Sequence, residues 1–278
     1  MTGPARLLVP LVVAAVAVLA IGVVLQAAGD DPAVAPLEPE VAEEAGVVVY
    51  QPVVLDTHPH AITSYTQGLE FVDGLLLEST GLRGESSILL ADPETGEAVD
   101  SMDLAASLFG EGATVVGDEV YQLTWTSEVA IVRSLDDLSE VRRFEYEGPG
   151  WGLCLLDERL VMSNGSAELA FRDPETFEVL DTVQVSGPNG PIEEINELEC
   201  VDGRVWANVF QTNRILELDP TTGALVGEVD LTELVPDGFE GDQALVLNGI
   251  AFNAATGRFW VTGKQWPVIY EVEFEPVS

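Results

Sequence analysis

Short apolar runs separated by turn residues fill the chain from about residue 47 onwards, and one pattern among them recurs five times. Each copy begins with a polar or aromatic residue, continues with a glycine in most copies, and then enters an apolar run. The five copies begin at Gln67, Glu111, Trp151, Asn196 and Asn248, at intervals of 40 to 52 residues. Strand-like units that repeat at roughly this period are typical of propellers and solenoids.

Each unit fits four strands. A turn such as Val72-Asp73-Gly74 leads from the opening run into a second one, and a turn such as Asp173-Pro174-Glu175-Thr176 separates a third strand from a fourth. Turn residues at these intervals favour an antiparallel meander, and the body shows no helical period. We therefore predict an all-β fold, a five-bladed β-propeller of four-stranded antiparallel sheets. A six-bladed ring is disfavoured because no sixth opening pattern exists.

The last unit contains only three strands after Asn248. We predict that the missing strand comes from the start of the body, at residues 47–55. Such a strand would join the two ends of the chain in one blade and leave no open seam in the ring.

The N-terminus carries an apolar run of 22 residues, Leu7 to Ala28, without a charge. This length would span a bilayer as a hydrophobic helix, which needs about 20 residues, although a cleaved signal peptide is the alternative. Residues 1–28 are therefore predicted to be a transmembrane anchor or signal peptide. Arg6 favours a body on the outer side of the membrane, so we expect an extracytoplasmic protein, either membrane-anchored or secreted. Residues 29–46 are predicted to form an acidic linker rich in proline and alanine, and residues 47–278 the propeller domain.

The formal net charge is −37, from 11 Lys and Arg against 48 Asp and Glu. This charge argues against nucleic-acid binding, because the phosphate backbone would be repelled. It fits both a salt-tolerant surface and a general acidic bias of the source's proteins.

The two cysteines, Cys154 and Cys200, lie on the opening strands of the third and fourth units, offset by one position. The offset places them on opposite strand faces, and neighbouring blades present opposite faces to each other. An extracytoplasmic location would permit a disulfide. Two separate buried thiols are the alternative.

The residues that open the units predict a binding site. The first strand of each blade in a propeller lines the central channel, so the five openers should surround one mouth of that channel. Aromatic residues lie close in sequence to these positions, at Phe109, Trp125 and Phe210. Convergent polar groups with aromatic walls indicate a small-molecule site. Trp206 and Trp260 lie in mid-strand and are predicted to pack between blades.

Glu111 is the candidate for acid–base chemistry. It lies between Gly110 and Gly112, where little of its own chain shields it, and desolvation by aromatic neighbours would raise its pKa towards neutrality. A turn glutamate in solvent or in an ion pair is the alternative. Lys264 is the only lysine in the chain, which weakly points to a function. Metal catalysis lacks support, because the only two histidines are His58 and His60 in one His-Pro-His stretch, predicted to be a surface loop.

Ten short motifs resemble, in their order, the plant and bacterial type of glutaminyl-peptide cyclotransferase. The resemblance runs from about Tyr50 to Phe274. The motifs are Tyr65-Thr-Gln-Gly-Leu69, Glu78-Ser-Thr-Gly-Leu82, Phe109-Gly-Glu-Gly112, Tyr121-Gln-Leu-Thr-Trp125, Gly150-Trp-Gly-Leu153, Met162-Ser-Asn-Gly-Ser166, Asn196-Glu-Leu-Glu199, Val205-Trp-Ala-Asn-Val209, Leu247-Asn-Gly-Ile250 and Val261-Thr-Gly-Lys-Gln-Trp-Pro267. The family's fold is a five-bladed propeller, in agreement with the repeat count.

The resemblance implies a reaction in which an N-terminal glutaminyl residue cyclises to pyroglutamyl and releases ammonia, without a metal or another cofactor. It implies that Glu111 shuttles a proton and that Gln67, Asn196 and Lys264 hold the amide and its oxyanion. Phe109, Trp125 and Trp151 would wall the pocket. The family often has tryptophan at the position of Phe210, so substrate orientation could differ here.

The expected partners are peptides or proteins that begin with glutamine, and a monomer is expected. The alternative function is a non-catalytic extracytoplasmic propeller that binds peptide termini or a protein partner, because the same pocket without turnover would give the same sequence pattern. The natural substrates and the role of Asn248 stay open.

Overall fold

The computed structural model describes residues 46–277. The predicted anchor or signal peptide and nearly all of the predicted linker lie outside the described residues. Within residues 46–277, no helix has the length and apolar character needed to cross a membrane.

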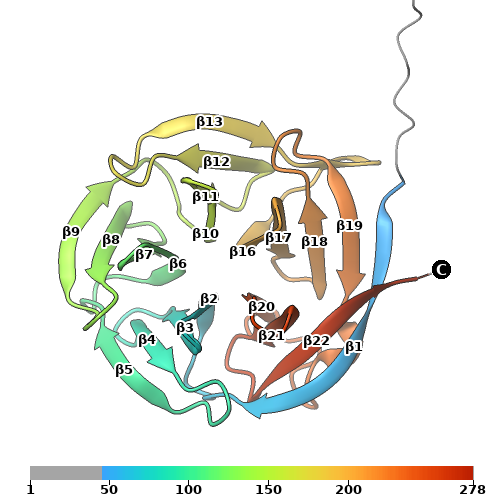
Figure 1. Cartoon of the computed structure of the whole chain (residues 1–278), viewed down its shortest axis with the longest axis horizontal. Helices are drawn as coiled ribbons and strands as arrows, with labels where there is room; N and C mark the ends of the chain where they lie inside the picture. The colour runs from blue at the N-terminus through green and yellow to red at the C-terminus, as the bar shows by residue number, and fades with distance from the viewer. Residues whose placement is uncertain (1–45, 278) are drawn as a thin grey trace, which may run out of the picture. The chain divides into compact units, whose positions relative to one another are not determined.

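Five four-stranded antiparallel sheets surround a common centre, and the last two of them join edge to edge in one sheet of eight strands (Figure 1). This confirms the predicted all-β fold of four-stranded antiparallel sheets. We refer to the sheets as blades and number them along the chain. Blade one holds β2 (Thr66–Val72), β3 (Leu75–Thr80), β4 (Ser87–Ala91) and β5 (Ala98–Asp103), and blade two holds β6 (Gly110–Val116), β7 (Glu119–Thr124), β8 (Val129–Ser134) and β9 (Glu140–Glu145).

The other blades follow the same order, with the first strand of each innermost. Blade three holds β10 (Leu153–Leu156), β11 (Arg159–Ser163), β12 (Glu168–Arg172) and β13 (Val179–Gln184). Blade four holds β16 (Ile195–Val201), β17 (Arg204–Val209), β18 (Arg214–Leu218) and β19 (Leu225–Asp230), and blade five holds β20 (Leu247–Asn253), β21 (Arg258–Gly263), β22 (Val268–Pro276) and β1 (Val48–Pro59). A short hairpin of β14 (Ser186–Gly187) and β15 (Gly190–Pro191) and a 3₁₀ turn, η1 (Thr232–Leu234), lie in the connections.

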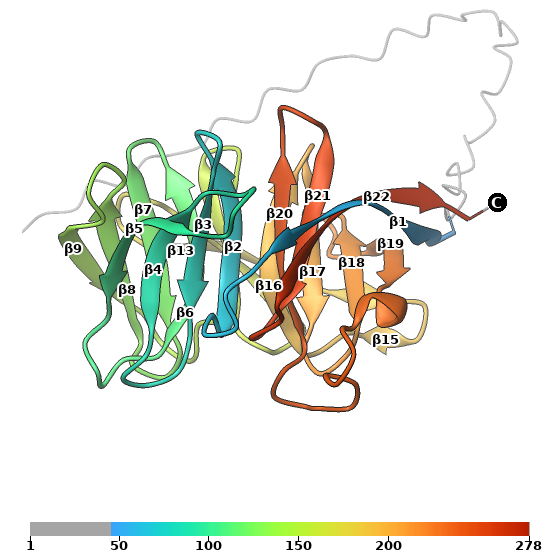
Figure 2. The ribbon, with the colours of Figure 1, turned by 90° about the horizontal axis from the view of Figure 1, so that it is seen from below.

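The first strand of the described chain closes the ring, as the sequence predicted. β1 pairs antiparallel with β22 along most of its length, from Tyr50 opposite Pro276 to Pro59 opposite Val268. Its first residues also pair in parallel with β19 of blade four, which joins blades four and five in one continuous sheet of eight strands. Figure 2 shows β1 beside both β22 and β19.

β1 is longer than predicted and includes most of the His-Pro-His stretch, so the prediction of a surface loop there was wrong. The His58 ring is buried and stacks on Trp260, with 4.1 Å between the ring centroids. The His60 side chain is only 4% exposed and contacts Glu78. Both rings are buried because the outer strand of blade five continues across the seam towards blade one. Trp206 and Trp260 pack in the hydrophobic cores between neighbouring blades, as predicted.

Glycine at the second position of the repeated pattern lets the inner strands approach one another. A Cβ atom on Gly68 would lie 2.6 Å from the Ala113 nitrogen, and one on Gly112 would lie 2.6 Å from the Leu153 nitrogen. A Cβ atom on Gly152 would overlap with the Asn196 carbonyl oxygen. Any side chain at these positions would therefore push neighbouring blades apart.

Blade four has Glu197 where the other blades have glycine. Glu197 is 1% exposed, and its carboxylate accepts hydrogen bonds from the Leu69 nitrogen at 3.3 Å and the Ile250 nitrogen at 2.9 Å. One buried side chain thus connects blade four to blades one and five. Burial raises the pKa of Glu197 well above its usual value.

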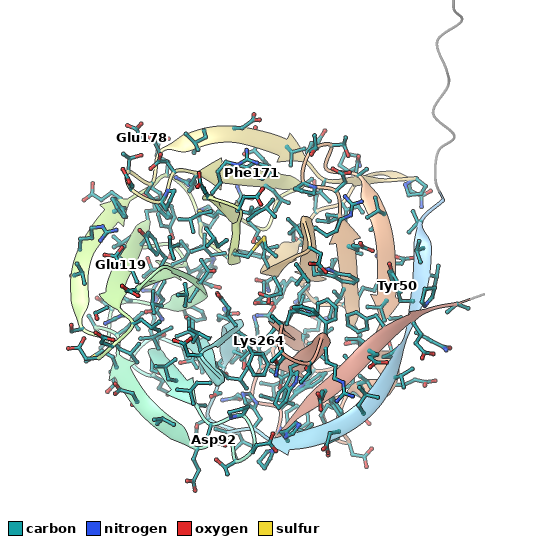
Figure 3. The ribbon with its side chains drawn as sticks, in the orientation of Figure 1. Tyr50, Asp92, Glu119, Phe171, Glu178 and Lys264 are labelled. Atoms are coloured by element: carbon teal, nitrogen blue, oxygen red, sulfur yellow. A yellow bond between two sulfur atoms is a disulfide. The ribbon has the colours of Figure 1, made fainter. Side chains whose placement is uncertain are left out.

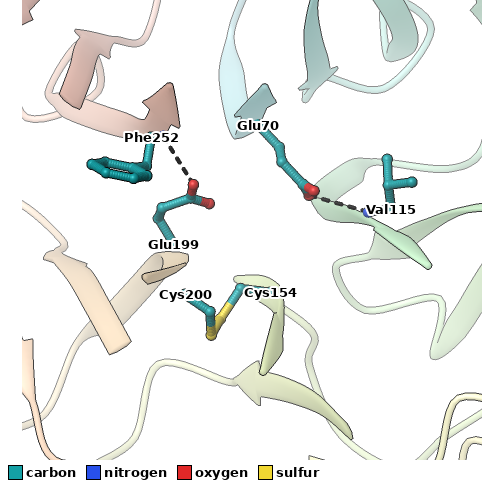
Figure 4. Close-up of a disulfide and its surroundings, with 6 residues drawn as sticks. All are labelled: Glu70, Val115, Cys154, Glu199, Cys200 and Phe252. Carbon is teal, nitrogen blue, oxygen red and sulfur yellow. Dashed lines mark hydrogen bonds between the residues drawn. A yellow bond between two sulfur atoms is a disulfide. The ribbon is translucent and has the colours of Figure 1, made fainter. Parts of the chain in front are cut away.

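A disulfide joins Cys154 on β10 to Cys200 on β16, with 5.6 Å between their Cα atoms (Figure 4). This bond links the inner strands of blades three and four. Two more carboxylates lie nearby in Figure 4: Glu199 accepts from the Phe252 nitrogen and Glu70 from the Val115 nitrogen. The inner strands are therefore connected by side chains as well as by packing.

Candidate active site

Nine side chains line a cavity of about 230 Å³ at one mouth of the ring. Eight of them are residues that the sequence analysis selected: Gln67, Phe109, Glu111, Trp125, Trp151, Asn196, Phe210 and Lys264. The ninth, Tyr65, was missed. Its signal was present in the sequence, since it is an aromatic residue two positions before an opener.

The antiparallel pairing of the two inner strands explains why these residues meet. The start of the first strand lies opposite the end of the second, so residues just outside the two strands share one edge of the blade. The main-chain nitrogen of Trp125 donates to the Phe109 carbonyl, that of Phe210 to Glu194, and that of Lys264 to Val246. Because every blade pairs its two inner strands in this way, residues that are distant in sequence lie together at one mouth of the ring.

The openers gain their orientation from irregularities in the strands. The pairing register shifts between Thr66 and Gly68, between Gly110 and Ala113, and between Ile195 and Leu198. Bulges of this kind redirect side chains and are common beside active sites. Gln67, Glu111 and Asn196 lie within these shifts, and each is at most 4% exposed.

Glu111 is a buried carboxylate without a partner for its side chain among residues 46–277. Burial raises its pKa well above the usual value, and the positive charge of Lys264 opposes this rise. Its main chain is fixed, because the Ser79 hydroxyl donates to the Glu111 carbonyl. A buried carboxylate whose pKa is raised in this way can both accept and return a proton.

Lys264 lies near the centre of the ring (Figure 3) and is 3% exposed. Its Nζ lies 4.9 Å from the ring centroids of both Tyr65 and Phe210, a favourable placement for a cation. Burial lowers the pKa of Lys264 to about 8, and Glu111 opposes this change. The site thus contains a carboxyl group and an amine. Burial raises the pKa of Glu111 and lowers the pKa of Lys264.

Asn248 orients Gln67, although it does not line the cavity. The Asn248 Nδ2 atom lies 2.9 Å from the Thr66 carbonyl oxygen and 3.0 Å from Gln67 Oε1. A main-chain carbonyl can only accept, so the amide nitrogen of Asn248 must face it, and the second hydrogen of that nitrogen goes to Gln67 Oε1. The Gln67 Nε2 group is therefore left as a donor for the cavity.

Aromatic rings form the walls. Trp151 and Phe210 meet edge to face at 5.5 Å, and Phe109 lies 5.7 Å from Trp125. Trp125 is 40% exposed and stands at the rim. The Trp151 Nε1 atom is buried without a hydrogen-bond partner in the described part of the chain, so this lining residue has a donor to offer.

A buried pair supports the segment that carries Tyr65 and Gln67. His60 Nε2 lies 3.0 Å from Glu78 Oε1, and the same carboxylate accepts hydrogen bonds from Ser64 and Thr66. Burial opposes charge on both groups, but their mutual attraction outweighs it, so the His60 pKa is raised and the Glu78 pKa is lowered. The pair fixes the chain on either side of Tyr65.

Comparisons with known proteins agree with this geometry. The family model described as glutamine cyclotransferase matches residues 25–274. A glutaminyl-peptide cyclotransferase of Arabidopsis thaliana is 36% identical over 233 residues, which are 81% of this chain and 72% of the relative. The crystal structure of Myxococcus xanthus glutaminyl cyclase superposes with a TM-score of 0.78 at 36% identity, covering 84% of this chain and all of that one. The chain belongs to the glutamine cyclotransferase family.

Proposed function

We propose that this protein is a glutaminyl-peptide cyclotransferase, which converts N-terminal glutaminyl residues of peptides to pyroglutamyl residues and releases ammonia. The observation that carries the proposal is the buried Glu111 carboxylate in an aromatic-walled cavity, where no other side chain among residues 46–277 forms a hydrogen bond or ion pair with it. The cavity volume, about 230 Å³, suits one glutaminyl residue rather than a longer peptide segment. Family membership supports the same activity.

The substrate supplies its own nucleophile. The α-amine nitrogen forms a bond to the side-chain amide carbon, and the bond from that carbon to the amide nitrogen then breaks. Glu111 takes the proton that the α-amine loses on attack and delivers a proton to the departing nitrogen, which leaves as ammonia. The Glu111 carboxylate thus serves both proton transfers, from the α-amine and to the leaving nitrogen, and its raised pKa suits both.

The developing oxyanion needs donors placed in advance. Gln67 Nε2 is available because Asn248 occupies Gln67 Oε1, and Trp151 Nε1 is buried without a partner in the described residues. The Lys264 ammonium adds positive charge. We assign these groups and the Asn196 amide to holding the substrate amide and its oxyanion.

The walls hold the glutaminyl side chain in a folded conformation and exclude water. Folding matters because the two reacting groups belong to one flexible residue, and restricting its conformers lowers the entropic part of the barrier. Phe210 contributes an apolar face against Trp151 and Lys264. It lacks the indole N–H that the family often has there, so fewer polar contacts to the substrate are expected.

No metal is assigned to the reaction. The nine lining residues contain one carboxylate and neither histidine nor cysteine, a donor set that does not suit a catalytic zinc ion. We expect turnover to survive treatment with a chelator at temperatures well below unfolding.

The test is ammonia release from a dipeptide that begins with glutamine, catalysed by the full chain. Replacing Glu111 with Gln keeps the shape of the side chain but removes the proton carrier, so kcat should fall by about 10²- to 10⁴-fold. Glu158→Gln, at an exposed turn, is the matched control and should keep normal turnover.

Near-normal turnover of the Glu111→Gln variant would rule out the proton-transfer role. If the wild-type chain binds the dipeptide but never cyclises it, the protein is instead a non-catalytic propeller that binds peptide termini.

We further propose an extracytoplasmic location, in which the apolar run at residues 7–28 is either an anchor or a cleaved signal. The disulfide between Cys154 and Cys200 supports an oxidising compartment. Fractionation of cells that express the full chain, with a reporter of N-terminal processing, distinguishes the anchored form from the secreted one.

A further inference from the structure

A cluster of three possible metal ligands lies on the two outer strands of blade five, away from the cavity. Asp56 and His58 are two positions apart on β1, so their side chains share one face of the sheet. Glu271 on β22 is the cross-strand partner of Asp56. One ligand atom from each residue falls within 4.8 Å of the others. None of these residues lines the cavity.

His58 points an unused nitrogen into this cluster. The side chain is 6% exposed, and Nε2 has no hydrogen-bond partner within residues 46–277. This atom lies 4.0 Å from Glu271 Oε2, and a small side-chain movement would let one ion bind both atoms at about 2.1 Å each. Stacking on Trp260 fixes the ring plane. Buried polar atoms in proteins usually have a hydrogen-bond partner. A bound metal ion would explain why this imidazole nitrogen has none among the described residues.

The other groups around His58 are arranged for ligation. Its Nδ1 atom faces the Glu94 carboxylate at 3.7 Å, and a carboxylate behind a ligating histidine orients the ring and strengthens the ligand. Glu94 belongs to the turn between β4 and β5 of blade one. The Asp92 carboxylate holds that turn through the nitrogens of Glu94 and Thr95, and the turn packs against Pro59 at Gly96.

Arg258 does not block the site. Its Nη1 atom lies 3.1 Å from Glu271 Oε1, whereas Oε2 is the oxygen that faces His58. The ion pair thus orients the Glu271 carboxylate and leaves one oxygen for a cation. The large negative charge of the chain further favours divalent cations near its surface.

We propose that Asp56, His58 and Glu271 bind a divalent transition-metal ion, with Zn²⁺ the expected ion. One imidazole and two carboxylates suit zinc and its neighbours, whereas calcium and magnesium prefer oxygen ligands alone. Because the ligands come from the first and the last strand of the ring and Glu94 from blade one, the ion stabilises the closure of the ring. It takes no part in the cyclisation.

The experiment titrates Zn²⁺ into the metal-stripped full chain by calorimetry and records thermal unfolding with and without the ion. Co²⁺ serves as a spectroscopic probe of the coordinating groups. We expect one saturable site per chain, a higher unfolding temperature with Zn²⁺, and unchanged cyclisation at low temperature. Replacing His58 with Gln or Asp56 with Asn should weaken Zn²⁺ binding at least tenfold, and Glu94→Gln by about tenfold.

The controls separate a built site from general attraction of cations by an acidic chain. Glu175 occupies the same Asp-Pro-Glu-Thr turn in blade three, so Glu175→Gln should bind Zn²⁺ like the wild type. Asp56 is exposed, so Asp56→Asn remains informative even if His58→Gln fails to fold. The proposal is overturned if the wild type shows no saturable site, or if Asp56→Asn binds and is stabilised as well as the wild type.

Discussion

At the scale of single residues, one polar side chain of the cavity has half of its amide group held by a neighbouring residue. Gln67 shows this well, because its carbonyl oxygen is held by Asn248 and only its amide nitrogen remains. Asn248, whose role the sequence left open, is thus a positioning residue. It acts through Gln67 and needs no contact with the substrate.

This relation predicts a non-additive double mutant. Asn248→Ala should lower kcat/KM by about tenfold because the Gln67 amide loses its orientation. Once Gln67 is replaced with Ala, adding Asn248→Ala should change kcat/KM little further. Steady-state kinetics of the two single variants and the double variant check this. Fully additive effects would show that Asn248 acts independently of Gln67.

Lys264 and Glu111 predict the pH dependence of the reaction. The base form of Glu111, with its raised pKa, becomes more populated as pH rises, which gives an ascending limb in kcat/KM. The lowered pKa of Lys264, about 8, means that its positive charge is lost above that pH, which gives a descending limb. In Lys264→Arg the charge persists, so the descending limb should move to higher pH. An unmoved limb in this variant would show that another group causes it.

At the scale of the element, the opener of each inner strand and the residue after it have different roles. In blades one, two and four the opener lies in a bulge and faces the cavity. In blades one to three the next residue is a glycine that lets the neighbouring blade approach closely. Blade four exchanges the small residue for Glu197, whose carboxylate takes hydrogen bonds from two other blades. The position after the opener therefore brings blades together in two ways. A glycine there lets the backbones pack closely, and Glu197 accepts hydrogen bonds from the neighbouring blades.

Gly152→Ala tests the close approach. The added methyl group would overlap with the Asn196 carbonyl, so the inner strands of blades three and four must separate. We expect a loss of about 1–3 kcal/mol in the free energy of unfolding and a rise in KM, because Asn196 lines the cavity. Denaturant unfolding and kinetics measure the two effects. Gly46→Ala, where a Cβ atom meets nothing within 4 Å, should change neither.

At the scale of the whole described ring, covalent and hydrogen-bonded links join inner strands that are far apart in sequence. Cys154–Cys200 closes a loop across 46 positions. Glu70 and Glu199 accept main-chain hydrogen bonds from the next blades, and burial raises the pKa of Glu70 to about 7. These links keep the cavity's walls at fixed distances, which suits a catalyst that works by positioning.

Reduction of the disulfide should therefore lower stability. The chain-entropy model gives about 4 kcal/mol for a loop of this length, and the unfolding midpoint should drop accordingly on adding reductant. The variant with both Cys154 and Cys200 replaced by Ala is the control, since reductant should leave its midpoint unchanged. If reductant leaves the wild-type midpoint unchanged too, the bond contributes nothing to stability.

The sequence by itself determined the blade pattern, the closing strand and eight of the nine cavity residues. It could do so because strand alternation and turn residues act locally, and because antiparallel pairing places the openers and the aromatic residues near them at the same mouth. Lys264 followed from the family resemblance. Only the tertiary structure decided that the two thiols pair, that His58 and His60 are buried, and that Asn248 turns the Gln67 amide. These depend on contacts between blades, where the partner of each side chain lies far away in the chain and no local pattern records it.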